Sequence, residues 1–140
     1  MGILSDFFIA DPSACRSYGG GDDFDSTDKC QFKGLTALQG AQFLAALRGG
    51  HFAVEMIREF ELVTPDDADD WTVSVPQDMV EALARIRMDE IVAVADQFAQ
   101  VTSEELGWSR DEFVPIVTEL TALSRRAIET NKQMYLWNCL

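Results

Sequence analysis

The strongest constraint on the fold is the final segment of the chain, Met134-Tyr-Leu-Trp-Asn-Cys-Leu140, which is apolar and aromatic almost throughout. Terminal residues usually fray because they bury little surface, so an apolar terminus indicates a segment that is held inside the protein. Alternate residues of a strand face opposite sides, and here both sides are mostly apolar. We therefore expect an interior β-strand that is covered on both faces.

The opening segment, Ile3–Ile9, is the expected neighbour of this terminal strand. It is apolar and aromatic on both faces apart from Ser5 and Asp6, which is typical of a second buried strand. Two further strands are expected. Trp71–Val75 alternates as a half-buried strand does, and Cys30–Phe32 is a shorter candidate.

Apolar residues at helical spacing predict helices between these strands. Thr36 is the expected cap of the first helix, and the S-x-x-E pattern of Ser109 and Glu112 predicts a capping box at the start of the last one. Pro76 suits the first position of another helix and Asp89 the cap of the next. A short helix is also expected over Phe52–Phe60.

The order is therefore strand, loop, two helices, strand, three helices, strand. This order predicts an α+β fold. We expect a small, mostly antiparallel or mixed sheet with the N- and C-terminal strands adjacent, packed by about four to five helices. A chain of 140 residues without an internal repeat is long enough for one core, so a single domain over residues 1–140 is expected.

The charge is strongly negative, with 24 acidic and 11 basic residues and a net charge of −13. Such a chain repels phosphate backbones, which disfavours direct binding of nucleic acid. Solubility is the plainest role of this charge, and recognition of a basic protein partner is the sharper one. We predict that two acidic loops carry the interaction. Their residues are Asp22, Asp23, Asp25 and Asp28 in the first loop, and Asp66, Asp67, Asp69 and Asp70 in the second.

No motif for catalysis, metal binding or nucleotide binding stands out, so we expect no catalytic residue, no metal and no cofactor. Asp23, Asp25 and Thr27 offer alternate oxygen atoms as a calcium loop does, but Asp28 occupies the position that requires glycine. His51 is the single histidine, and the spacing of the chain identifies no nucleophile beside it. A non-catalytic binding protein is favoured over an enzyme.

Two other functions remain open. The loop Cys15–Lys29 could cover a pocket near His51 that binds a small molecule or a cation or supports a modest enzymatic reaction. The segment Phe52–Phe60 could present apolar surface for a homodimer, so monomer and homodimer are both open. Trp108 either packs on Phe113 as a hydrophobic staple or is an exposed anchor for a partner.

The cysteines, Cys15, Cys30 and Cys139, are odd in number and have no metal-ligand spacing. They are expected to be free thiols in a reducing compartment, although Cys15 and Cys30 flank the glycine-rich loop and pairing between them stays open. No apolar run approaches the roughly 20 residues that span a bilayer, and no secretory signal is visible. We expect a cytoplasmic protein without a membrane partner.

Several segments carry a resemblance to a known family: the Met-Gly start on an apolar strand, Gly34–Leu38 opening a helix, Val75-Pro76 before Met79–Leu83, and Ala127–Lys132 leading into Tyr135–Trp137. Together they resemble small uncharacterised bacterial proteins of the YfbM-like family. The chain lacks the Asp-Lys-x-Trp segment of that family, and Asp28-Lys29 is the part of the sequence most similar to it. The resemblance implies an α+β fold and a bacterial origin, and it implies no activity and no site residues.

Overall fold

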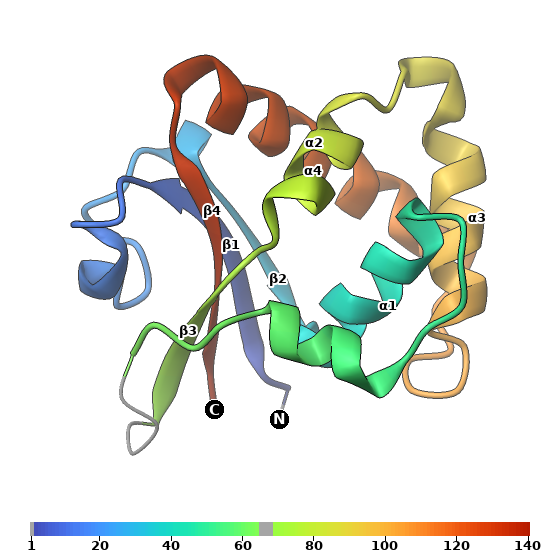
Figure 1. Cartoon of the computed structure of the whole chain (residues 1–140), viewed down its shortest axis with the longest axis horizontal. Helices are drawn as coiled ribbons and strands as arrows, with labels where there is room; N and C mark the ends of the chain where they lie inside the picture. The colour runs from blue at the N-terminus through green and yellow to red at the C-terminus, as the bar shows by residue number, and fades with distance from the viewer. Residues whose placement is uncertain (1, 65–68) are drawn as a thin grey trace.

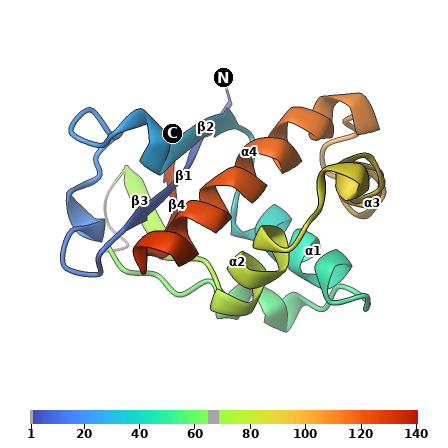
Figure 2. The same ribbon diagram turned by 90° about the horizontal axis from the view of Figure 1, so that it is seen from above.

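The computed structural model describes residues 2–64 and 69–140 and has two layers, a four-stranded antiparallel sheet and a layer of helices on one of its faces (Figures 1 and 2). The strands lie in the order β2, β1, β4, β3. Their bounds are β1 Leu4–Ala10, β2 Lys29–Lys33, β3 Asp70–Ser74 and β4 Gln133–Cys139. The predicted α+β class with adjacent terminal strands is confirmed, since β1 and β4 are the two central strands.

The helical layer contains four α-helices in the described part of the chain: α1 Ala37–Leu47, α2 Gln77–Ala84, α3 Ile91–Val101 and α4 Arg110–Thr130. The long helix α4 contacts β1 and β2, and α2 and α3 pack against α4. Phe43 of α1 is fully buried and stacks on Phe98 of α3, with 4.1 Å between ring centroids. Met134 and Leu136 complete this core from the sheet side. None of the described helices is long and apolar enough to cross a membrane.

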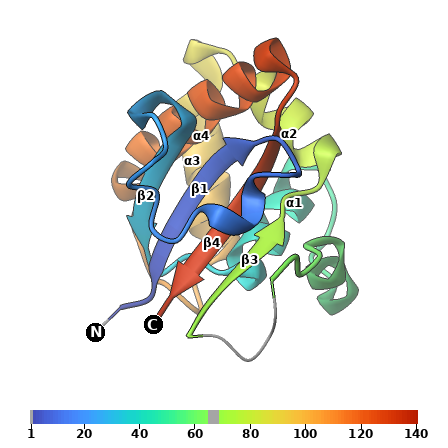
Figure 3. The ribbon, with the colours of Figure 1, turned by 90° about the vertical axis from the view of Figure 1, so that its left-hand side faces the viewer.

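The opposite face of the sheet has a second, smaller core, covered by the loop between β1 and β2, which lies in front of the sheet in Figure 3. Phe8 stacks on Tyr18 of this loop with 4.0 Å between ring centroids. Tyr135 and Trp137 are buried in the same core. The predicted alternation of the terminal strand is therefore confirmed, because neighbouring residues of β4 enter different cores.

The predicted start of the first helix is confirmed by a reciprocal capping box. The Thr36 hydroxyl oxygen accepts from the backbone N–H of Leu38 at 3.3 Å, and the Thr36 N–H donates to Gln39 Oε1 at 2.9 Å. At the last helix, the Ser109 hydroxyl oxygen accepts from the Glu112 N–H at 3.2 Å, so Ser109 is the cap as expected. Both ends are fixed by local hydrogen bonds, which explains why a short sequence pattern predicts them.

Other predicted helix starts are wrong in detail. Pro76 is the residue before α2 and not its first residue. Asp89 does not cap α3, because a 3₁₀ turn over Met88–Glu90 precedes this helix. The Glu90 carboxylate accepts from the Arg87 N–H at 2.9 Å and satisfies that end instead.

The segment Phe52–Phe60 contains the expected short helix, which is a 3₁₀ helix over Val54–Glu59. A helix this short gains little from its own hydrogen bonds, so tertiary packing decides its form. Here Phe60 packs so closely on α1 that a side chain at Gly40 would lie 2.7 Å from its ring. Val54 is left 64% exposed, and homodimerisation through this segment stays a prediction.

The possible disulfide between Cys15 and Cys30 is ruled out by the sheet. Cys15 is buried in the core under the loop, whereas Cys30 is buried in the core under the helices. The two thiols lie on opposite faces of the sheet, and both are free. Both cysteines flank the same loop in the sequence, but Cys15 lies in a 3₁₀ turn of the loop on one face of the sheet, whereas Cys30 of β2 points to the other face.

Candidate functional site

A cleft of about 930 Å³ opens at the end of the sheet where β1 and β3 finish and β4 begins. Its acidic lining residues are Asp11, Glu59, Glu61 and Glu81. Lys132 is the basic residue in its lining. We call this feature the acidic cleft.

A second pocket of about 430 Å³ borders the acidic cleft, since the two share the lining residues Pro12, Glu61, Ser74 and Gln133. Its wall also includes Cys15 and Tyr135. The shared wall means that Glu61 faces both spaces. The acidic cleft therefore extends from the end of α4 to the loop that covers the second core.

The carboxylates of the acidic cleft differ in how far their charge is compensated. Glu59 forms an ion pair with Arg48 at 2.7 Å, and the hydrogen bonds from this guanidinium lower the pKa of Glu59. Glu81 lies 3.6 Å from Arg85. Within the part of the chain that the structure describes, neither Asp11 nor Glu61 has a basic partner at ion-pair distance. These two acids carry the uncompensated charge of the cleft.

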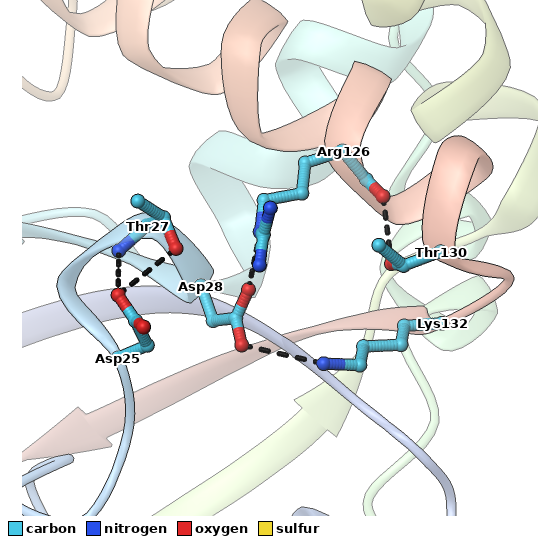
Figure 4. Close-up of polar contacts among 6 residues, drawn as sticks. All are labelled: Asp25, Thr27, Asp28, Arg126, Thr130 and Lys132. Atoms are coloured by element: carbon cyan, nitrogen blue, oxygen red, sulfur yellow. Dashed lines mark hydrogen bonds and ion pairs between the residues drawn. The ribbon is translucent and has the colours of Figure 1, made fainter.

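An ion-pair cluster lies beside the acidic cleft (Figure 4). Asp28 accepts from Arg126 Nε at 2.6 Å and pairs with Lys132 Nζ at 3.3 Å, with its side chain only 12% exposed. Asp25 instead accepts from the Thr27 N–H and hydroxyl, both at 3.0 Å, and these bonds lower the pKa of Asp25. Asp28 thus holds the loop against the end of α4 and is shared by two basic side chains, Arg126 and Lys132.

The predicted acidic loops are not brought together. Asp22 and Asp23 are exposed, as is Asp25, so three acids of the first loop remain on the surface. Asp66 and Asp67 lie outside the described residues. Asp69 is exposed, and Asp70 accepts from the Trp137 indole N–H at 2.9 Å. Asp70 begins β3, whereas the acidic cleft, beside which Asp28 lies, is found where β3 ends. The two predicted acidic loops therefore lie at opposite ends of the sheet.

The remaining predicted residues also separate. Trp108 is half-buried, and its ring centroid lies 5.5 Å from that of Phe113, which favours the staple over the exposed anchor. His51 is exposed and follows α1, which packs in the core on the helical face of the sheet, whereas the loop covers the second core on the other face. The expected pocket between this loop and His51 is therefore not formed, because the sheet and helices lie between them.

Sequence reasoning missed the residues that line the acidic cleft. Its acids are scattered over positions 11, 59, 61 and 81, and none belongs to a run or a motif. Their proximity depends on the pairing of β3 with β4 and on the end of α4, neither of which leaves a local signal. In the part of the chain that the structure describes, no three His, Cys, Asp or Glu side chains are grouped to hold a metal ion.

The two tyrosines of the chain, Tyr18 and Tyr135, are both buried. Burial raises the pKa of Tyr18 far above its usual value, and the hydrogen bond to Asp6 adds to this effect. Burial, with a further contribution from Cys15, raises the pKa of Tyr135 to about 12. Because the folded protein favours both neutral phenols, their contribution to stability is complete below about pH 10 and declines as the pH rises through 12.

We therefore expect the folded protein to show no phenolate absorbance near pH 10, where the same chain in denaturant titrates both tyrosines. An ultraviolet pH titration with and without denaturant measures this directly, since no other tyrosine contributes. Tyr135→Phe should remove the first titration step and leave only the later one. Phenolate that appears near pH 10 in the folded wild type would contradict the buried placement of the two rings.

Comparison with protein-family models, with curated proteins and with solved structures found no match to this chain. The resemblance to the YfbM-like family thus rests on the sequence pattern alone.

Proposed function

We propose that this protein is a non-catalytic binding protein that receives a basic segment of a protein partner in the acidic cleft. The observation that carries the proposal is the pair of uncompensated carboxylates, Asp11 and Glu61, on the wall of a cleft of about 930 Å³. Two carboxylates that face one cavity repel each other, and a lysine or arginine side chain placed between them relieves that repulsion.

The rest of the lining supports a peptide as the occupant. Ser74, Gln77, Asn131 and Gln133 offer hydrogen bonds to a peptide backbone, while Pro12, Val75 and Ile128 supply apolar contact. The ammonium of Lys132 opposes a basic ligand, but Asp28, which it shares with Arg126, offsets part of this charge. The net charge of −13 would also speed the encounter with a basic partner at low salt.

The proposal does not assign catalysis to the acidic cleft. His51, the single histidine, does not line it. Cys15 of the bordering pocket donates its S–H to the Pro12 carbonyl at 3.2 Å and so faces no base. Binding accounts for the charge and shape of the cleft without a further group.

The double variant Asp11→Asn/Glu61→Gln tests the proposal. We expect it to weaken binding of a fluorescent lysine- and arginine-rich peptide about fivefold, since each exposed ion pair contributes roughly 0.5 kcal/mol. Fluorescence anisotropy at low and high salt gives the affinity and its salt dependence. The matched control is Glu104→Gln/Asp111→Asn, which changes the net charge equally at exposed positions outside the cleft.

Equal weakening of peptide binding by both double variants would contradict binding in the acidic cleft, because it would show that only the net charge matters. Wild-type protein that binds an acidic peptide of the same length as well as the basic one would also reject the proposal. A pull-down from lysate then identifies the natural partner, which should be recovered by wild type and lost with the cleft variant.

A further inference from the structure

A third concavity, of about 370 Å³, lies on the loop side of the sheet and is distinct from the acidic cleft, with which it shares no lining residue. Its floor comes from Asp6 of β1 and Trp137 of β4, which face each other in the register of the central strands. Gln31 and Lys33 of β2 border one side and Gly20 of the covering loop another. We call it the Asp6 pocket.

Asp6 is a charged residue in the centre of the sheet, and it is only 4% exposed. Its Oδ2 accepts from the Tyr18 hydroxyl at 2.7 Å and from Gln31 Nε2 at 3.1 Å. Both donors are neutral. Among the described residues, none donates a side-chain hydrogen bond to Oδ1, and no basic group lies at ion-pair distance. Asp6 Oδ1 is therefore open to the pocket and can accept from a ligand, and a cation bound there would offset the cost of placing this charge in the sheet.

Trp137 makes the same pocket favourable for a cation. Its indole N–H donates to the Asp70 carboxylate at 2.9 Å. A charged acceptor on the N–H raises the electron density of the ring, which strengthens attraction between the ring face and a positive charge. Asp70 also adds a second negative charge near the pocket, since the Trp137 indole lies between Asp70 and Asp6. The predicted acidic residue Asp70 thus contributes to a site, through Trp137.

The shape of the pocket depends on the glycine-rich part of the covering loop. Gly20 has φ +101°, a conformation that favours glycine, and it places only backbone beside Trp137. Gly21 has φ +81°, and a side chain there would lie 2.5 Å from the Tyr18 hydroxyl oxygen. The two glycines therefore add no side chain at the edge of the pocket, and they leave space for the Tyr18 hydroxyl to reach Asp6.

We propose that the Asp6 pocket binds a small organic cation, a primary ammonium carried on an apolar or aromatic body. Asp6 Oδ1 would accept from the ammonium, and Trp137 and Leu4 would pack against the body. A metal ion suits the site less well, because hard cations require several oxygen ligands and Asp6 is the one carboxylate among the described residues that line this pocket. This inference goes beyond the proposed function, since it holds whether or not the acidic cleft binds a partner.

Lys33 is the one basic residue in the lining that the structure describes, and it bears on which ligand charge the pocket favours. In the register of β1 and β2 it faces Leu4, whereas Gln31 faces Asp6, so Lys33 lies diagonally from the carboxylate. Its side chain is exposed and forms no ion pair with Asp6. Lys33 should therefore repel a cationic ligand weakly. Lys33→Met is expected to tighten binding of a monocation about twofold and would weaken binding of a zwitterion whose anionic end needs this lysine.

The test uses three probes of the same shape and different charge: benzylamine, benzyl alcohol and benzoate. Titration of the full-length, ¹⁵N-labelled protein is followed by NMR at the Trp137 indole N–H and the Gln31 side-chain amide. We expect benzylamine to shift both resonances at millimolar concentration, with benzyl alcohol and benzoate at least tenfold weaker. Asp6→Asn keeps the shape and an acceptor for Tyr18 and should weaken benzylamine at least tenfold. Asp22→Asn, which removes an exposed charge from the same loop, should change nothing.

Two results would overturn the inference. One is equal affinity for benzylamine and benzyl alcohol in the wild type, which would mean that Asp6 does not select charge. The other is a folded Asp6→Asn variant that binds benzylamine as the wild type does. If Asp6→Asn does not fold, the charge series on the wild type and the Lys33→Met variant still decide the outcome, because neither alters a buried group.

Discussion

Deletion of residues 134–140 is expected to abolish cooperative folding. These residues form all but the first position of β4, which pairs with β1 on one side and β3 on the other. Four buried apolar side chains are lost, two from each core: Met134 and Leu136 from the first, Tyr135 and Trp137 from the second. At roughly 1.5–3 kcal/mol for each buried apolar side chain, this removes about 6–12 kcal/mol, comparable to the whole stability of a typical domain.

Circular dichroism with urea denaturation measures this effect. The shortened chain should show no cooperative transition, whereas deletion of Leu140 alone should leave the midpoint of the wild type unchanged, because this residue is 78% exposed. A chain lacking residues 134–140 that still unfolds cooperatively at the wild-type midpoint would show that β4 is not an interior strand.

The parts of the fold that the sequence predicts are those encoded by neighbouring residues. The alternation in Met134–Leu140 indicates two buried faces because a strand has a period of two, and both faces are indeed buried. Thr36 and Ser109 predict helix starts because a cap involves only the next few residues. The 3₁₀ form of the short helix within Phe52–Phe60 is not encoded by neighbouring residues, since contact between Phe60 and Gly40 fixes that segment from outside.

The candidate sites depend on distant residues, so the sequence indicates only fragments of them. Asp6 stands out as an acid in an apolar strand, but nothing nearby in the sequence shows that Tyr18 and Gln31 hold its carboxylate. Asp28 looks like one acid in an exposed run, whereas Arg126, 98 positions away, draws it inward. Acidic runs are visible in a sequence. The pairing that decides which of these acids remain free is not.

The two cores also have different roles, one in stability and the other in placing the loop that borders the binding sites. The core under the helices contains most of the buried apolar side chains and supports the sheet. The smaller core fixes the loop between β1 and β2, which reaches the acidic cleft through Pro12 and the Asp6 pocket through Gly20. A change in the smaller core should therefore disturb binding, while a change of similar size in the larger core should affect stability alone.

Phe8→Ala tests this division and is expected to destabilise the protein by about 3–5 kcal/mol, as removal of a buried phenylalanine usually does. Phe8 is fully buried and contacts the rings of Tyr18, Phe24 and Tyr135. Without its ring, Tyr18 loses the surface on which it stacks, so its hydrogen bond to Asp6 should weaken as well. Urea denaturation gives the loss of stability, and native-state hydrogen exchange should show faster exchange over residues 11–28.

Phe43→Ala is the matched comparison, since Phe43 is equally buried and stacks at a similar distance on Phe98. Its loss of stability should be similar, about 3–5 kcal/mol, but exchange over residues 11–28 should change only through global unfolding. Benzylamine binding should weaken with Phe8→Ala and persist with Phe43→Ala. If both variants alter loop exchange and binding equally, the two cores unfold as one unit and the loop has no stability of its own. The sheet then transmits every change in packing to both faces, because Phe7 and Phe8 are adjacent residues of one central strand that enter different cores.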